Sequence, residues 1–218
     1  VLDDANIEEA VKGLMLAKMR NGGAACNAAN RIYVARSIGD KFIAEFTKAM
    51  AAMKMGVGRE AGTQLGASVS IKERNKIAEL VEAAKARGAK VHLGAATPDG
   101  AGAFYPATVL EVSKDDDLLA NEIFGPVAPI ALFDTDEEAL TLANDTEYGL
   151  MSFVYSQELK RAIRFAEGID AGMVAINRGL ISDPAAPFGG VKQSGLGREG
   201  GFEGVHEFLQ TKYIGVEI

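Results

Sequence analysis

The sequence has a single cysteine, two histidines and no tryptophan in its 218 residues. One cysteine excludes an internal disulfide, and with two scattered histidines it gives no zinc-type ligand cluster, so no metal site is predicted. No apolar run is long enough to cross a bilayer. The formal net charge of −7 disfavours nucleic acid and anionic membranes as partners. We therefore expect a protein of a reducing compartment, the cytoplasm, in which the thiol stays free.

The composition is that of an ordinary globular protein, with 48% hydrophobic and 24% charged residues. The length suits one sizeable domain with its own core, and no repeat, low-complexity tract or linker divides the chain. We therefore treat residues 1–218 as a single domain. A glycine-rich segment at residues 177–201 interrupts the regular pattern, and long segments of this kind are usually functional.

Short apolar strand patterns alternate with helical patterns along most of the chain. Helix caps are predicted at Asn6, at Ser70 with Glu73, at Asp134 with Glu137, and at Ser156. The predicted helices span residues 7–19, 42–55, 70–88, 134–144, 156–168 and 202–210. The predicted strands span residues 31–35, 91–93, 105–112, 127–133, 150–155, 172–176 and 212–218. This alternation predicts an α/β fold, with a mostly parallel sheet covered by helices on both faces.

Cys26 stands in an unusual setting for a packing residue. Two glycines precede it and polar residues surround it, in the sequence RNGGAACNAANR of residues 20–31. Glycines allow a backbone to approach a ligand closely, which is where a nucleophilic sulfur is expected. On the residues alone, a buried cysteine without chemistry is an equally good interpretation.

Three segments taken together resemble the aldehyde dehydrogenase superfamily. They are the Cys26 segment, EIFGPV at residues 122–127, and PFGGVKQSGLGRE at residues 187–199. Their order and spacing are similar to those of the family, and the resemblance covers residues 2–213. The sequence looks closest to the branch that oxidises succinate semialdehyde, because Arg20, the GLIS segment at residues 179–182 and residues 191–200 are similar to that branch.

The resemblance implies that Cys26 is the catalytic nucleophile. A thiolate adds to the aldehyde carbon to form a thiohemiacetal, a hydride then leaves for the nicotinamide, and water cleaves the resulting thioester. A free thiol has a pKa of about 8.5, so the site must favour the thiolate or supply a base. A helix beginning at Cys26 or Asn27 would favour the thiolate through its N-terminal dipole.

The resemblance assigns cofactor contacts to Glu122 and Phe124. A carboxylate accepts hydrogen bonds from paired ribose hydroxyls, and an aromatic face packs on a nicotinamide ring. Without the family, a solvated glutamate and a core phenylalanine would be the better interpretation. The expected cofactor is NAD or NADP, and the sequence does not distinguish them.

The resemblance also assigns the substrate contacts. Arg20 and Ser182 would bind the distal carboxylate of a small aldehyde, and Phe188 would form an aromatic wall of the substrate tunnel. The simpler alternatives are a helix-terminal cation favoured by the dipole, an ordinary loop serine and a core aromatic. The four glycines at 189, 190, 195 and 197 do not open a helix after a strand, so they are not a dinucleotide fingerprint.

The sequence departs from the family at Ala24, where a glutamine or glutamate is usual. The family's cofactor domain, general-base glutamate and oxyanion-hole asparagine would precede Val1. We therefore expect the catalytic domain of an enzyme about twice as long, nearly inactive by itself because a missing general base costs about 10²- to 10⁴-fold.

Other functions remain open at this point. One is a dehydrogenase for another small aldehyde, and another is a thiol-dependent acyl hydrolase, for which neither histidine is convincingly placed. A third is an interaction domain, because the tail strand at about residues 212–218 resembles the family's subunit-contact segment and an unpaired edge invites pairing. The full-length enzyme is expected to be a homo-oligomer, a dimer or a tetramer.

Overall fold

The structure, a computed structural model, describes residues 1–218 and divides the strands among three sheets. The largest sheet has four strands in the order β1-β4-β3-β2. β1 (Ile32–Ala35), β4 (Val127–Phe133) and β3 (Thr108–Glu111) are parallel, and β2 (Lys90–Leu93) joins the edge antiparallel to β3. All but one of the residues of β4 are buried, as expected of a strand covered on both faces.

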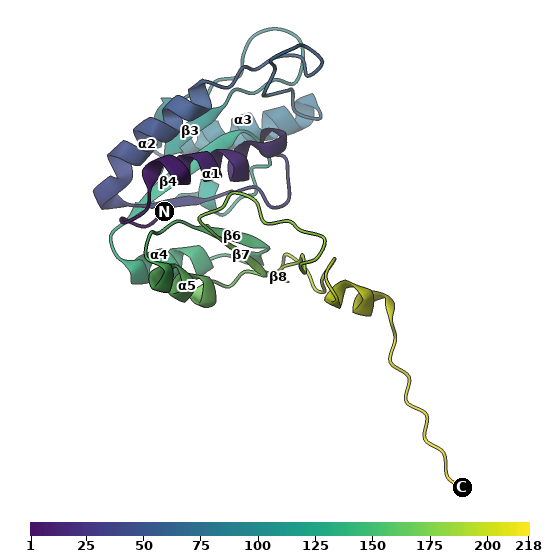
Figure 1. Cartoon of the computed structure of the whole chain (residues 1–218). Coiled ribbons are helices and arrows are strands. Elements are labelled where there is room, and N and C mark those ends of the chain that lie inside the picture. The colour runs from purple at the N-terminus through teal and green to yellow at the C-terminus, as the bar shows by residue number, and fades with distance from the viewer.

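Helices cover both faces of this sheet (Figure 1). α1 (Ile7–Met19) and α2 (Arg36–Ala51) pack on one face, in a core that includes Val109 of β3. α3 (Ile71–Ala86) packs on the other face, in a core that includes the next residue, Leu110. Consecutive residues of a strand point to opposite faces, so β3 contributes to both cores. The predicted α/β fold with a mostly parallel sheet is confirmed.

A second parallel sheet pairs β6 (Met151–Val154) with β7 (Met173–Ile176). β5 (Tyr148–Gly149) and β8 (Val191–Lys192) form a short antiparallel pair beside it. The predicted single run of strands is therefore split among separate sheets, with the β6–β7 sheet in the lower half of the molecule in Figure 1.

The first two residues connect the four-stranded sheet to the β6–β7 sheet. The backbone N–H of Ala35 donates to the Val1 carbonyl at 3.0 Å, and the N–H of Leu2 donates to the Tyr155 carbonyl at 3.0 Å. This segment thus lies between β1 and the end of β6, as the position of the N-terminus in Figure 1 also shows.

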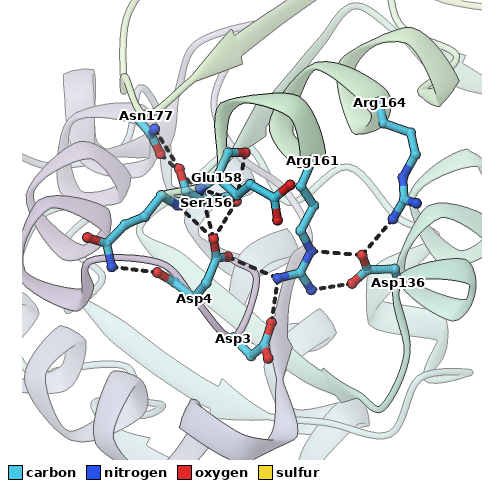
Figure 2. A network of polar contacts seen from close by, with 9 residues as sticks. Asp3, Asp4, Asp136, Ser156, Glu158, Arg161, Arg164 and Asn177 are labelled. Carbon is cyan, nitrogen blue, oxygen red and sulfur yellow. Dashed lines mark hydrogen bonds and ion pairs between the residues drawn. The ribbon is translucent and has the colours of Figure 1, made fainter.

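Asp4 fixes the start of α5 (Leu159–Gly168) (Figure 2). Its carboxylate accepts hydrogen bonds from the Ser156 hydroxyl at 2.8 Å and from the backbone N–H of Glu158 at 3.0 Å. Ser156 was predicted to cap this helix, but the cap is Glu158. The reason is that Ser156 lies two residues before the N-cap, where its hydroxyl donates to Asp4 and accepts from the Glu158 N–H at 3.2 Å and does not reach the first turn of the helix.

Arg161 extends the same network to α4 (Asp136–Asn144) (Figure 2). Its guanidinium forms ion pairs with Asp3, at 2.7 Å, and with Asp136. Arg164 contacts the same Asp136 carboxylate at 2.9 Å from a more exposed position. The N-terminal segment, α4 and α5 therefore share one polar network.

The remaining predicted elements differ at their ends. Helix 42–55 begins earlier, at Arg36, and strand 105–112 is shortened to β3. A short 3-10 helix, η2 (Asp117–Leu119), follows β3, and the predicted helix 202–210 is the 3-10 helix η3 (Glu203–Phe208).

Residues 212–218 are not a strand, contrary to the prediction. The tail extends away from the body of the molecule (Figure 1), all of its residues are exposed, and its backbone makes no hydrogen bond within the chain. A strand requires a neighbouring edge for its N–H and C=O groups, and no edge of this chain reaches the tail.

Candidate active site

Cys26 lies exposed on a turn between α1 and β1. After α1, the 3-10 helix η1 (Arg20–Gly23) leads into this turn, which is closed by a hydrogen bond from the Ala28 N–H to the Ala25 carbonyl at 3.0 Å. No helix begins at Cys26 or Asn27. The chain leaves the turn directly for β1, and a helix dipole therefore does not act on the thiol.

A close approach of two glycines places this turn against the loop of residues 122–125. Gly23 has a φ of +80°, and a Cβ atom at this position would lie 2.1 Å from the Gly125 carbonyl oxygen. Only glycine adopts such a conformation without strain and permits such a contact. The sequence thus requires a glycine here because the Cys26 segment and the 122–125 loop touch through their backbones.

Glu122 and Phe124 share a cavity wall with Cys26. The cavity has a volume of about 440 Å³ and continues inward between the four-stranded sheet and the β6–β7 sheet. Phe124 has a φ of +52°, unusual for a residue with a side chain, and it is 43% exposed. Glu122 is also exposed. An accessible ring and an accessible carboxylate beside the thiol fit the requirements of a nicotinamide and a ribose.

Arg20, Asn27 and Ser182 form a connected chain beside the thiol. The Arg20 guanidinium donates to the Asn27 side-chain oxygen at 2.8 Å, and the Asn27 amide nitrogen lies 3.5 Å from the Ser182 hydroxyl. Asn27 is buried, whereas Arg20 and Ser182 are exposed. The structure therefore brings the two predicted carboxylate-binding residues together. The bridging residue, Asn27, directly follows Cys26 and was not singled out from the sequence.

Phe188 and Cys26 both line a second, open hollow, which the glycine-rich segment also lines. Phe188 and Glu199 exchange two backbone hydrogen bonds of 2.7 Å, which fix that segment against itself. Cys26 therefore lies where two hollows meet, one with Glu122 and Phe124 and the other with Phe188.

Lys18 is a buried cation on the wall of the first cavity. It is 1% exposed, makes no hydrogen bond or ion pair within the chain, and burial lowers its pKa to about 7. The Tyr155 hydroxyl, on the wall of the same cavity, is also buried without a partner. The sequence contained a signal for Lys18, because it lies four residues after Leu14 on the apolar face of α1.

No group of three or more histidine, cysteine, aspartate or glutamate side chains is arranged to hold a metal ion. No helix is long and apolar enough to span a membrane.

The family model described as "Aldehyde dehydrogenase family" matches residues 1–214. The chain belongs to the aldehyde dehydrogenase family. It is 49% identical over 217 residues to a succinate-semialdehyde dehydrogenase of Paenarthrobacter nicotinovorans, covering 99% of this chain and 48% of that protein. It is 41% identical over 218 residues to a glutarate-semialdehyde dehydrogenase of Pseudomonas putida, covering 100% of this chain and 45% of that protein.

Solved structures agree with this membership. The crystal structure of succinate-semialdehyde dehydrogenase from Burkholderia pseudomallei superposes with a TM-score of 0.93 at 41% identity, over 95% of this chain and 43% of that chain. The predicted resemblance is thus confirmed. The chain spans about half the length of the curated relatives that it matches.

Proposed function

We propose that this chain is the catalytic domain of an NAD(P)-dependent aldehyde dehydrogenase that oxidises succinate semialdehyde to succinate. The observation that carries the proposal is the chain of contacts from Arg20 through Asn27 to Ser182, beside Cys26. A guanidinium and a hydroxyl near a thiol suit an aldehyde with a carboxylate at its far end. Relatives that act on succinate and glutarate semialdehydes support this substrate class.

Each residue has a chemical role in the proposal. The Cys26 thiolate adds to the aldehyde carbon, and the new carbon–sulfur bond gives a thiohemiacetal. NAD(P), when bound, supplies the acceptor for the hydride of that carbon. Loss of the hydride leaves a thioester on Cys26, and water cleaves it to release the acid and the thiol. Glu122 binds ribose hydroxyls, Phe124 packs on the nicotinamide, and Phe188 walls the substrate path.

Arg20→Leu tests the substrate assignment in the protein that carries this chain. We expect kcat/KM for succinate semialdehyde to fall about 10- to 100-fold, because a charge-assisted hydrogen bond is lost, with little change for butanal, which has the same length and no carboxylate. Arg59→Leu, at an exposed arginine outside the site, is the control. An equal loss for both aldehydes would contradict the carboxylate role of Arg20.

Cys26→Ala tests the nucleophile. Intact-mass measurement after mixing with aldehyde and cofactor should show an acyl adduct on the unchanged protein and none on the variant. An adduct on the variant would exclude Cys26 as the nucleophile. Cleavage of a simple ester without cofactor, in the absence of aldehyde oxidation, would favour the acyl hydrolase instead.

We also propose that the 218 residues alone are nearly inactive and that the whole enzyme is a cytoplasmic homo-oligomer. The first proposal rests on the resemblance, which assigns the general base and one oxyanion donor to residues outside this chain. Their loss costs about 10²- to 10⁴-fold and about 10²- to 10³-fold. Formation of NAD(P)H by the purified 218-residue chain at the rate of the longer protein would contradict it.

A further inference from the structure

The side chain of Asn30 holds the loop that carries Glu122 and Phe124. Its amide nitrogen donates to the Asn121 carbonyl at 2.7 Å, and its amide oxygen accepts from the Ile123 N–H at 3.0 Å. One side chain therefore uses its donor and its acceptor together on the backbone at both sides of Glu122. Only a neutral amide offers both functions in this geometry.

These are the main polar attachments of the loop. The backbone N–H groups of Glu122, Phe124 and Gly125 make no hydrogen bond within the chain, so the Ile123 N–H is the one bonded donor of residues 122–125. At its far end the loop approaches the Cys26 segment closely at the Gly23–Gly125 contact. Backbone groups without partners leave a loop freer to move, so the Asn30 contacts, together with the buried Ile123 side chain, hold this loop in place.

The burial pattern explains how fixing Ile123 orients its neighbours. The Ile123 side chain is 1% exposed in the core beneath α3, whereas Phe124 is 43% exposed and Glu122 is exposed. Phe124 departs from extended backbone, with a φ of +52°. Because Glu122 and Phe124 directly flank Ile123 and both line the cavity, holding the Ile123 N–H while its side chain is buried also fixes the backbone from which these two side chains reach the cavity.

Asn30 belongs to the same segment as the thiol. It lies four residues after Cys26, and the adjacent Ala29 N–H donates to the Ala17 carbonyl of α1 at 3.2 Å. Cys26 and Asn30 therefore lie on one segment, and the Ala29 hydrogen bond attaches that segment to α1. We propose that Asn30 is a positioning residue that sets the Glu122–Phe124 loop for the nicotinamide cofactor relative to Cys26. This inference rests on the proposed function.

The test compares Asn30→Leu and Asn30→Asp in the protein that carries this chain, with Asn75→Leu on the exposed side of α3 as the matched control. Leucine has a similar size and removes both hydrogen bonds, whereas aspartate keeps the acceptor for the Ile123 N–H. Three quantities are measured: hydrogen exchange of the Ile123 amide, the dissociation constant of NAD and of NADP, and KM for the aldehyde.

We expect Asn30→Leu to accelerate exchange at Ile123 and to weaken cofactor binding about 10-fold, the effect of losing two neutral hydrogen bonds. Asn30→Asp should be intermediate, and KM for the aldehyde should stay within about twofold. The rate of Cys26 alkylation by iodoacetamide should remain unchanged, which shows that the thiol segment is intact.

Faster exchange at Ile123 with unchanged cofactor affinity would show that Asn30 stabilises the loop without positioning it for the cofactor, and this would overturn the inference. Unchanged exchange would overturn it as well. Cofactor binding without any aldehyde oxidation would overturn the proposed dehydrogenase activity instead, and the role of Asn30 would still be decided by the binding data.

Discussion

Lys18 has the least favourable environment of any charged side chain in the site. Its ammonium group lies in the cavity wall without an anion or a hydrogen-bond acceptor from this chain. Burial of an unpaired charge disfavours the charged form, and this lowers the pKa of Lys18 from 10.5 to about 7. The folded protein therefore binds this proton less tightly than the unfolded chain does.

This difference predicts that the free energy of unfolding rises with pH between about 7 and about 10. In that range the unfolded lysine is still protonated and the folded lysine is neutral, so the slope is about 1.4 kcal/mol per pH unit for one proton. Lys18→Met should remove this contribution and stabilise the protein at pH 7. Urea unfolding of both proteins at pH 7 and pH 9 gives the change in the free energy of unfolding with pH. The same change in the unchanged protein and in Lys18→Met would refute the buried charge.

At the residue scale, the sequence indicated the chemical groups of the site better than their connections. Cys26, Glu122 and Phe124 were expected together, and they line one cavity. Asn27 and Asn30 were not expected, because their partners lie 155 and about 90 residues away along the chain. An asparagine in a loop has no local pattern that reveals such a partner.

At the element scale, helix positions followed from apolar periodicity and caps, and the errors lie at the ends. Residue 134 was expected to cap α4, yet Thr135 does so by accepting from the Glu138 N–H at 3.2 Å. Asp134 pairs instead with Arg36, at 2.6 Å. A tertiary ion pair therefore shifts the cap by one residue, which no local pattern distinguishes.

The contact between η1 and the 122–125 loop predicts a severe effect of Gly23→Ala. The new methyl group would lie 2.1 Å from the Gly125 oxygen, and alanine would have to adopt a φ of +80°. Backbone strain of this kind costs about 1–3 kcal/mol and the clash adds to it. We expect the free energy of unfolding to fall by roughly 2–4 kcal/mol.

Gly58→Ala is the matched control, because its Cβ position is open and its φ is ordinary. It should change stability by less than about 0.5 kcal/mol. Chemical denaturation of the two variants and the unchanged protein gives both values. Similar stability of the two variants would mean that the backbones of η1 and the loop do not touch.

At the scale of the whole molecule, the tail is the part that the fold leaves without contacts. Tyr213, Ile214 and Val216 are 91%, 74% and 76% exposed on a segment that extends away from the body (Figure 1). Exposed apolar patches of this kind mark interaction surfaces. We therefore expect the tail to pair with a second copy of the protein.

Deleting residues 211–218 should then reduce the particle mass measured by light scattering. Val69→Ser, which removes an apolar side chain outside the tail that is 92% exposed, should leave the mass unchanged. An unaltered mass after the deletion would contradict the pairing of the tail with a second copy.

The network around Arg161 joins the N-terminal segment to α4 and α5, so its loss should destabilise the whole molecule. Arg161 and Asp136 are only 20% and 19% exposed. Arg161→Met should lower the free energy of unfolding by roughly 2 kcal/mol, which lies between the contributions of exposed and of buried ion pairs. Arg164→Met removes a cation from the same carboxylate, but Arg164 is 66% exposed, so it should cost less than about 0.5 kcal/mol.

The pH dependence separates the ion pair from packing. The hydrogen bond from Arg161 holds the pKa of Asp136 below its ordinary value, so the unfolded carboxylate takes up its proton first as the pH falls. The contribution of the pair is complete well above the ordinary carboxyl pKa of about 4, and it disappears as the pH falls through the lower folded pKa. The stability difference between the unchanged protein and Arg161→Met should therefore shrink below about pH 4. Denaturant unfolding from pH 7 to pH 3 measures this, and a difference independent of pH would assign the loss to the packing of the arginine stem.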